Sequence, residues 1–330
     1  MTSESIHDVT DVIRSAARTL HDADIDTPEH DAKLLLAEAC GRDLRDIDKA
    51  MLMGGSLWTA CHASMRVLMP PDAGAASSDS SATAGDAVTT ALARFHAMIA
   101  RRAAREPLQY ITGHAPFRYL DLEVGPGVFI PRPETETVVQ AGIDWLTRER
   151  LSTPRIVDLC AGSGAIGLSL VTEVRGAQVW AVEKVPRTYD WTMRNWRRIS
   201  RLDPLAADNY HLELGDATSG TTLAQFDGTI DMVVTNPPYI PEAQIPEQPE
   251  VRDHDPKAAL YGGSADGTLI PERIVMRAAG LLRPGGVLVM EHDISQGPRL
   301  VSFAQANGFG QAHTGDDWTG RPRYLFAVRS

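Results

Sequence analysis

From residue 155 to the C-terminus, short apolar runs alternate with segments of helical pattern, and no other feature constrains the fold as strongly. The runs have the length and the β-branched composition of buried strands. Strands that alternate with helices form a parallel sheet covered by helices on both faces, so the sequence predicts an α/β fold. The predicted strands are residues 156–160, 179–183, 211–214, 230–235 and 287–291, with 324–328 as a last, antiparallel strand.

Polar side chains stand at the carboxyl ends of these predicted strands. In an open α/β sheet, ligands bind in the crevice at that edge, where the strand ends come together. We therefore expect these side chains to share one binding site. They are Asp158, Glu183, Asp216, Asn236 and Glu291.

A glycine-rich turn follows the first predicted strand. Gly162, Gly164 and Gly167 satisfy the pattern G-x-G-x-x-G. Glu183 lies at about the distance expected for a carboxylate that holds ribose hydroxyls. The pattern alone fits a nicotinamide or flavin dinucleotide as well as S-adenosyl-L-methionine (AdoMet), so an oxidoreductase stays open as one interpretation. Titration with NADH and with AdoMet distinguishes the two.

Two carboxylates favour AdoMet over a dinucleotide. Asp158 precedes the glycine turn, and a carboxylate there suits a ligand with an ammonium group better than one with a pyrophosphate. Asp216 ends the third predicted strand, where it can accept a hydrogen bond from an adenine amino group. Aspartate beside glycine is also a common turn former, so the position of Asp216 is ambiguous by itself.

The tetrapeptide Asn236-Pro237-Pro238-Tyr239 follows the fourth predicted strand. Two prolines cannot continue the sheet, so the strand ends there and Asn236 is restricted to extended geometry. The Asn236 carbonyl and a backbone carbonyl can accept from an NH2 group while Tyr239 stacks on its plane. The tetrapeptide therefore predicts a clamp for a planar amide or amidine near the methyl group of AdoMet, with a plain proline turn as the structural alternative.

The sequence before residue 131 predicts two further regions. Apolar residues recur at helical spacing within residues 1–105, which predicts a small helical domain. Within it, residues 70–86 are rich in Ala, Ser, Asp and Gly and predict a disordered insertion. Glycines alternate with apolar residues over 106–130, which predicts a β-hairpin linker to a domain of residues 131–330.

Composition narrows the class of protein. The formal net charge of −11 disfavours non-specific binding to nucleic acid. Cys40, Cys61 and Cys160 have no metal-ligand spacing and cannot all pair, so they predict reduced thiols in a cytoplasmic protein. The histidines do not cluster with cysteine, so no metal site is expected. No apolar run has membrane length, and the N-terminal segment does not have the pattern of a signal peptide.

Two motifs together resemble the class I AdoMet-dependent methyltransferases that modify a planar nitrogen: DLCAGSG from Asp158 and NPPY from Asn236. EPLQYITG (106–113), FIPRPETE (129–136) and AALYGG (258–263), with Asp266-Gly267, look like the HemK/PrmC family. The resemblance implies a Rossmann-like, seven-stranded, mostly parallel sheet with a small N-terminal substrate-recognition domain. It also implies methylation of the side-chain nitrogen (N5) of the glutamine in the Gly-Gly-Gln loop of class I peptide release factors.

The resemblance implies roles for particular residues. The glycine turn would line the methionine part of AdoMet, Glu183 would hold the ribose, and Asp216 with Ala217 would border the adenine. Together with Asp158, the residues predicted to bind AdoMet, with S-adenosyl-L-homocysteine as product, are Cys160, Ala161, Gly162, Ser163, Gly164, Glu183, Asp216, Ala217 and Asn236. The substrate amide would be held by Asn236, Pro237, Pro238 and Tyr239, of which Asn236, Pro237 and Tyr239 are the predicted catalytic residues.

The chain departs from the family pattern in several places. Cys160-Ala161 stands where the family often has Gly-Thr, and Ala217 stands where some members carry a bulkier side chain. The insertion at 70–86 has no counterpart. His292 stands in place of an apolar residue, and a lone histidine between acids at a strand end is more often structural than a general base.

Two other functions compete with release factor methylation. An amino methyltransferase of DNA or RNA bases uses the same Asn-Pro-Pro-aromatic motif, but flipping a base usually needs a basic groove, which the net acidity disfavours. A non-catalytic AdoMet-binding regulator has no need of an intact NPPY. We therefore expect a protein that acts on release factors and has no nucleic-acid substrate. We also expect it to be a monomer. The arginines at 194, 197, 198 and 201 predict a solvated helix face or, less simply, contact with an acidic partner or RNA.

Overall fold

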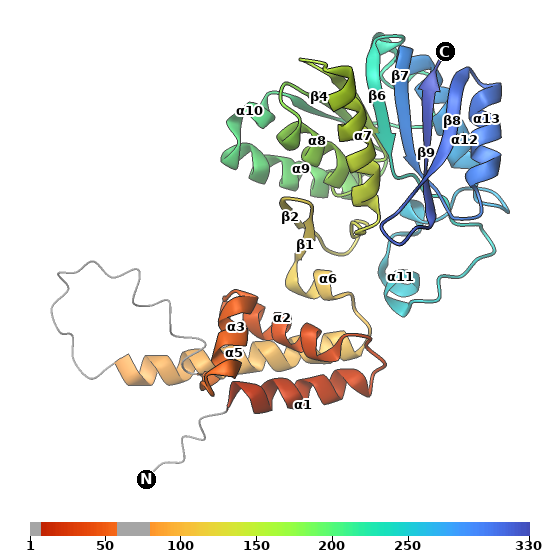
Figure 1. Cartoon of the computed structure of the whole chain (residues 1–330). Helices are drawn as coiled ribbons and strands as arrows, with labels where there is room; N and C mark the ends of the chain where they lie inside the picture. Colours follow the sequence, from red (N-terminus) through yellow and green to blue (C-terminus); the bar gives the residue numbers. More distant parts are fainter. Residues whose placement is uncertain (1–7, 58–79) are drawn as a thin grey trace. The chain divides into compact units, whose positions relative to one another are not determined.

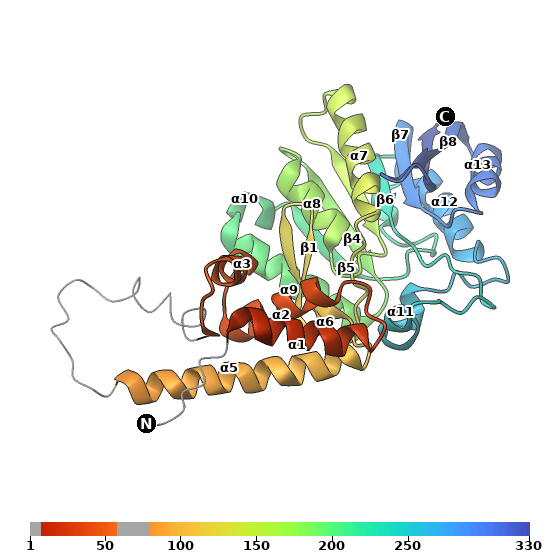
Figure 2. The same cartoon turned by 60° about the horizontal axis from the view of Figure 1, so that its bottom comes forward.

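The computed structural model describes residues 8–57 and 80–330 (Figures 1 and 2). The chain forms two compact units, Met1–Thr112 and Gly113–Ser330. The first unit is helical, and its apolar core is built by side chains that include Ile13, Leu35 and Phe95. Its described helices are α1 (Val9–His21), α2 (Pro28–Cys40), α3 (Leu44–Leu52), α5 (Ser80–Ala103) and α6 (Leu108–Thr112).

The helices of the first unit begin, end and pack for identifiable reasons. The Asp8 carboxylate accepts from the Thr10 backbone N–H at 2.7 Å and caps α1. Gly41 ends α2 in the left-handed conformation, with φ 63°. A buried ion pair between Arg102 and Asp31, 2.8 Å apart, joins α5 to α2. Unpaired charges are costly in such a core, so these two side chains fix how the helices meet.

Two predictions for this part of the chain need correction. Residues 70–79 of the expected insertion lie outside the described residues, but residues 80–86, expected to be disordered, form the start of α5. Tyr110 and Ile111, expected in a hairpin, lie in helix α6, because Ile111 is buried in the helical core. The hairpin is therefore shorter than predicted and consists of β1 (His114–Phe117) and β2 (Leu120–Glu123), paired antiparallel.

The second unit contains a seven-stranded, mostly parallel sheet, which confirms the predicted fold class. Its strands are β3 (Arg155–Leu159), β4 (Gln178–Glu183), β5 (Tyr210–Leu214), β6 (Ile230–Thr235), β7 (Leu282–Glu291), β8 (Phe309–Asp316) and β9 (Pro322–Arg329). The strand order is β5-β4-β3-β6-β7-β9-β8, with β9 antiparallel to β7 and to β8. Strand β7 begins earlier than the predicted strand at 287–291, because residues 282–286 form its irregular first part.

Helices cover both faces of this sheet (Figure 1). The helices of this unit are α7 (Thr135–Glu149), α8 (Ala165–Glu173), α9 (Pro186–Leu202), α10 (Pro204–Ala207), α11 (Pro249–His254), α12 (Leu269–Leu281) and α13 (Gly297–Ala306). The side chain of Ile156 packs in a layer with α7, α8 and α9, whereas Val157 and Leu159 pack in a layer with α12 and α13. Alternate residues of a strand point to opposite faces, so β3 is buried on both. Short 3-10 helices occur at Ala224–Phe226 and Lys257–Ala259.

The strand order positions a ligand site. The chain runs from β3 outward through β4 to β5, then returns to the other side of β3 to form β6 and β7. Such a reversal opens a crevice at the carboxyl ends of the two central strands. The predicted arginine cluster lies on α9, where Arg198 bonds to Asp121 at 2.8 Å and Arg194 stacks over the Trp191 ring. Among the helices of the described part of the chain, none is long and apolar enough to span a membrane.

Candidate active site

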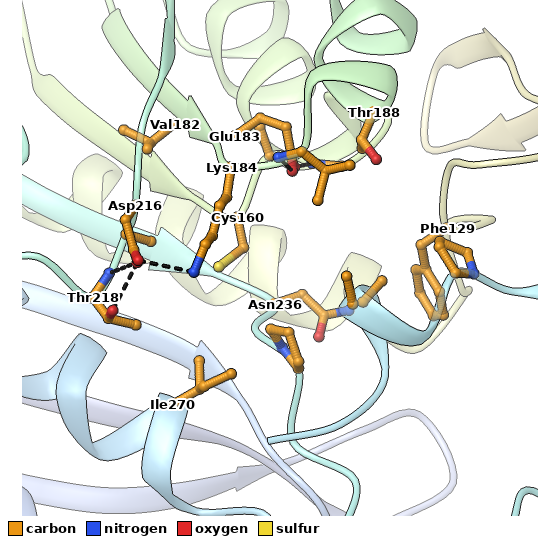
Figure 3. Close-up of a pocket in the computed structure, with 18 of the residues that line it drawn as sticks. Phe129, Cys160, Val182, Glu183, Lys184, Thr188, Asp216, Thr218, Asn236 and Ile270 are labelled. Carbon is orange, nitrogen blue, oxygen red and sulfur yellow. Dashed lines mark hydrogen bonds and ion pairs between the residues drawn. The ribbon is translucent and has the colours of Figure 1, made fainter. Parts of the chain in front are cut away.

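A cavity of about 620 Å³ opens at the crevice between the strand ends (Figure 3). Its volume lies in the range of cavities that hold a cofactor or another small molecule. The walls come from the turn after β3, the ends of β4 and β5, and the segments that follow β6 and precede α7 and α12. Of the predicted site residues, Cys160, Ala161, Gly162, Ser163, Glu183, Asp216, Ala217, Asn236 and Pro238 line the cavity.

The turn after β3 presents mainly backbone to the cavity. Cys160, Gly162 and Gly164 take positive φ values of 66°, 60° and 85°, and Gly164 is the N-cap of α8. Positive φ is unfavourable for a residue with a Cβ, so Cys160 holds a conformation that glycine adopts more easily. Burial raises the pKa of the Cys160 thiol, so the thiol is neutral. Gly164 itself does not line the cavity, because it lies beneath the turn against Leu168.

Asp158 is not in the cavity wall, contrary to the expectation that it would meet an ammonium group. It shares the sheet face of Ile156, so its side chain points beneath the glycine turn toward α8. Its Oδ2 accepts from the Gly167 N–H at 2.9 Å, and its Oδ1 has no partner among the described residues. Complete burial raises the pKa of Asp158 to about 8. The geometry makes it a support for the turn.

Glu183 connects the end of β4 to the glycine turn. Its Oε2 accepts from the Gly162 N–H at 3.0 Å, and its Oε1 accepts from the Val185 N–H at 2.8 Å. Burial raises the pKa of Glu183, and these backbone bonds act against that rise. Each carboxylate oxygen has a second lone pair, so Glu183 can still accept from a ligand in the cavity.

Asp216 forms a hydrogen-bonded corner after β5 that includes a residue the sequence did not single out. Its Oδ1 accepts from the Thr218 hydroxyl at 2.7 Å, and its Oδ2 accepts from Lys184 Nζ at 2.9 Å (Figure 3). Burial works against ionisation of Asp216, but these bonds outweigh it and lower the pKa to about 2. Lys184 directly follows Glu183, and that position was the only signal for it in the sequence.

Asn236 lies at the cavity with its amide nitrogen already bonded. Its Nδ2 donates to Thr135 Oγ1 at 3.2 Å, which leaves Oδ1 as the end that can accept from a ligand. Tyr239 does not line the cavity, so its ring does not have the position expected for stacking on a substrate amide. Its hydroxyl instead donates to the buried carboxylate of Glu291 at 3.0 Å. Pro237 is buried and also lies outside the cavity wall.

Two segments known only as family-like stretches in the sequence complete the cavity. Phe129, Pro131 and Thr135 come from FIPRPETE, and Tyr261 comes from AALYGG. Beside them, Arg132 bonds to Asp255 at 2.6 Å and stacks over the Phe129 ring, so it ties the two segments together. Burial raises the pKa of Asp255 to about 6 even though Arg132 opposes the rise.

His292 is buried away from the cavity. Its Nδ1 lies 2.7 Å from the Asp293 carbonyl oxygen, and burial lowers its pKa. A neutral histidine outside the cavity wall supports the structural interpretation over that of a general base.

Comparison with known proteins identifies the family of this chain. A family model described as PrmC N-terminal domain matches residues 79–113, and another, Conserved hypothetical protein 95, matches residues 108–252. The chain is 63% identical over 320 residues to a release factor glutamine methyltransferase of Bifidobacterium longum, which covers 97% of this chain and 99% of that one. It is 47% identical over 240 residues to the protein of that description in Streptomyces coelicolor, which covers 72% and 81%.

Among solved structures, the chain is similar to a release-factor-specific protein-(glutamine-N5) methyltransferase from Alicyclobacillus acidocaldarius. The identity is 22% and the TM-score 0.38, over 63% of this chain and 99% of that one. The 63% sequence identity to the relative from Bifidobacterium longum extends along almost the full length of both chains. The chain therefore belongs to the release factor glutamine methyltransferase family, the HemK/PrmC family that its motifs resemble.

Proposed function

We propose that this protein transfers a methyl group from AdoMet to the side-chain nitrogen (N5) of the glutamine in the Gly-Gly-Gln loop of class I peptide release factors, and so supports translation termination. The observation that carries the proposal is the state of Asn236 at the cavity. Its nitrogen is bonded within the protein, so its oxygen is the end available to accept from the NH2 group of a planar amide. The family to which the chain belongs supports the same conclusion.

The residues of the cavity fit AdoMet. Glu183 offers carboxylate oxygens for two ribose hydroxyls, and Asp216 with Ala217 offers an acceptor and a small apolar surface for adenine. The backbone of Cys160 to Gly162 leaves room for the methionine part, since a Cβ at Gly162 would meet no atom closer than 3.9 Å. When bound, AdoMet supplies an electrophilic methyl group. We assign Glu183, Asp216 and the turn to its binding.

Asn236 performs the main task on the substrate side. The lone pair of an amide nitrogen is delocalised into the carbonyl, so this nitrogen is a weak nucleophile. An acceptor on one of its N–H bonds orients the group and raises the electron density on nitrogen as the new bond forms. The extra proton then leaves to solvent. The rigid prolines after Asn236 hold this acceptor in place, which lowers the entropy lost on binding.

Mass spectrometry of a release factor tests the proposal. The release factor is incubated with this protein and isotopically labelled AdoMet, digested and sequenced. We expect one labelled methyl group on the glutamine of the Gly-Gly-Gln loop, and none on a release factor whose loop glutamine is replaced by alanine. DNA and ribosomal RNA are incubated in parallel. Label in the nucleic acid and not in the release factor overturns the proposal in favour of a base methyltransferase.

A further inference from the structure

We propose that Thr135 and Glu291 are positioning residues that fix which end of the Asn236 amide faces the substrate. Thr135 was not singled out in the sequence. Glu291 was predicted at the binding site only as a polar side chain at a strand end, and it does not itself line the cavity. The inference rests on the proposed function, because it assigns the substrate amide to the oxygen of Asn236.

A short chain of hydrogen bonds connects the three residues. Asn236 Nδ2 donates to Thr135 Oγ1 at 3.2 Å, and the Thr135 hydroxyl donates to Glu291 Oε2 at 2.7 Å. The second carboxylate oxygen, Oε1, accepts from the Tyr239 hydroxyl at 3.0 Å. Thr135 and Glu291 are 3% and 2% exposed, so water does not compete for these bonds. This series of hydrogen bonds therefore begins at the buried carboxylate of Glu291 and ends at Asn236 in the cavity wall.

The donors and acceptors in this chain fix the orientation of the amide. Burial raises the pKa of Glu291, whereas the hydrogen bonds from Thr135 and Tyr239 and the charge of Arg323 act against that rise. As a carboxylate Glu291 only accepts, so both hydroxyl protons point toward it. The Thr135 oxygen then has only lone pairs left for Asn236. An amide whose oxygen faced Thr135 would place two acceptors against each other, so the NH2 group of Asn236 must face Thr135. The Asn236 Oδ1 therefore faces the cavity, because Glu291 fixes the direction of the Thr135 hydroxyl.

The fold explains why these residues meet. Thr235 of β6 is in register with Met290 of β7, so the next residues, Asn236 and Glu291, leave two neighbouring parallel strands. Thr135 is the first residue of α7 and directly follows the N-cap residue Glu134. No side-chain bond caps α7, and the Thr135 hydroxyl points to the strand ends. The helix thus contributes a side chain to the strand edge.

A reversed amide would oppose the reaction. The NH2 group of Asn236 would then face the NH2 group of the substrate, donor against donor, and the substrate nitrogen would lose its acceptor. Loss of this acceptor disturbs the orientation of the substrate amide in the bound complex. The predicted contacts of AdoMet with Glu183 and Asp216 stay intact. We therefore expect a lower kcat with little change in AdoMet affinity.

The central test replaces Thr135 with Val, which has the same shape but no hydroxyl. We expect T135V to lower kcat about 10- to 100-fold, the scale of a misplaced reacting group. Thr135→Ser keeps the hydroxyl and is expected to restore kcat to within about 5-fold of wild type, since it restores the acceptor. Thr147→Val is the matched control, because Thr147 lies on the exposed face of the same helix and bonds only to the Ile143 carbonyl. Tm and the AdoMet dissociation constant are measured for every variant.

A spectroscopic readout reports the same bond without turnover. The side-chain NH2 signal of Asn236, assigned by its loss in Asn236→Ala, is followed by nuclear magnetic resonance in the selectively labelled protein. We expect slow exchange of one amide proton with solvent in wild type and T135S, and fast exchange in T135V. Equal exchange in all three overturns the inference.

A double-mutant cycle joins Glu291 to the chain. Glu291→Met removes the acceptor of both hydroxyls, and we expect kcat to fall at least as far as in T135V. Because both substitutions act through Asn236, the double variant T135V/E291M should lose less than the product of the two single losses. Losses that multiply mean that the two residues act separately, which overturns the proposed chain.

The outcomes separate this inference from the proposed function. If the wild-type protein does not methylate the release factor, the proposed function fails and the inference falls with it. If the wild type and T135V both methylate it at the same rate, the function stands and the inference alone is wrong. If T135S is as impaired as T135V, the hydroxyl is not the acting group, and the inference is again wrong.

Discussion

The two sides of the cavity are held together by different kinds of bond. On the cofactor side, Glu183 bonds to backbone N–H groups of Gly162 and Val185, which are 21 and 2 residues away in the chain. On the amide side, Asn236 depends on the side chain of Thr135, 101 residues away, and Thr135 depends on Glu291, 156 residues away. A cavity wall formed by backbone groups, as on the cofactor side, tolerates changes of side chain. A wall formed by a few side chains from distant parts of the sequence, as on the amide side, does not. Substitutions on the two sides should therefore have separate effects on AdoMet affinity and on the turnover of the enzyme.

The largest effect is expected on the amide side. Asn236→Ala should lower turnover by about two to three orders of magnitude, the loss seen when one preorganised hydrogen-bonding group is removed from a site. The AdoMet dissociation constant should stay within several-fold, because Glu183 and the glycine turn are unchanged. Single-turnover kinetics and calorimetry measure the two quantities. Near-normal turnover of this variant would refute the role assigned to Asn236.

The opposite separation is expected at Glu183. Glu183→Gln keeps the shape of the side chain but turns an NH2 group toward one of the two backbone donors that the carboxylate accepts. We expect AdoMet affinity to fall about 10- to 100-fold, the range of one or two lost charged hydrogen bonds. Turnover at saturating AdoMet should change little.

Glu213→Gln is the control for this variant, since Glu213 is an exposed carboxylate on the neighbouring strand β5. If Glu183→Gln lowers kcat and leaves affinity unchanged, the division of the cavity into a cofactor side and an amide side is wrong.

The same contrast explains what the sequence could predict. Gly162, Glu183 and Asp216 line the cavity as expected, because a strand followed by a turn brings them to the sheet edge by local geometry alone. Asp158 was misplaced because a residue near a strand end still points to one face or the other, and its face is that of Ile156. The fate of Tyr239 was not predictable, because its partner Glu291 is 52 residues away and only the folded sheet brings the two together.

Elements with few buried residues were also hard to predict. Strand β8 is an edge strand in which only the side chain of Phe309 is buried, so its residues FGQAHTGD lack the apolar run of a central strand. The early helix α6 was predicted as strand because its two adjacent apolar residues fit either structure. The predicted division into domains 1–105, 106–130 and 131–330, by contrast, stays a prediction about folding units.

Asp158 offers a smaller test on the cofactor side, through the pH dependence of stability. Its pKa of about 8 in the folded protein lies above the ordinary value, so between about pH 4 and pH 8 the folded state binds more protons than the unfolded state. The free energy of unfolding should therefore fall as the pH rises through this window. Asp158→Asn removes the titration, and the slope between about pH 5 and pH 7 should become flatter by on the order of 1–2 kcal/mol per pH unit.

Urea denaturation followed by tryptophan fluorescence measures this slope. Five of the six tryptophans lie in residues 113–330, so the signal reports the unit that contains Asp158. Asp144→Asn is a control, because Asp144 is an exposed carboxylate on α7. Parallel pH profiles for wild type and Asp158→Asn contradict the burial of the Asp158 carboxyl group beneath the glycine turn.

The smallest effect is expected at Lys184, where the cofactor side does depend on a side chain. Lys184 is 71% exposed and pairs with Asp216, and ion pairs at such positions contribute at most about 1 kcal/mol. Lys184→Met frees Asp216 Oδ2 to accept from adenine, so AdoMet should bind up to about 5-fold more tightly at low salt, with the gain fading as salt screens the pair. Lys184→Arg keeps the pair and should bind as wild type does. A loss of affinity in Lys184→Met beyond about 10-fold, more than a surface ion pair can explain, means that Lys184 itself contacts the cofactor. The cofactor side would then depend on a side chain as the amide side does. The two sides would differ only in how far apart in the sequence their hydrogen-bonded residues lie.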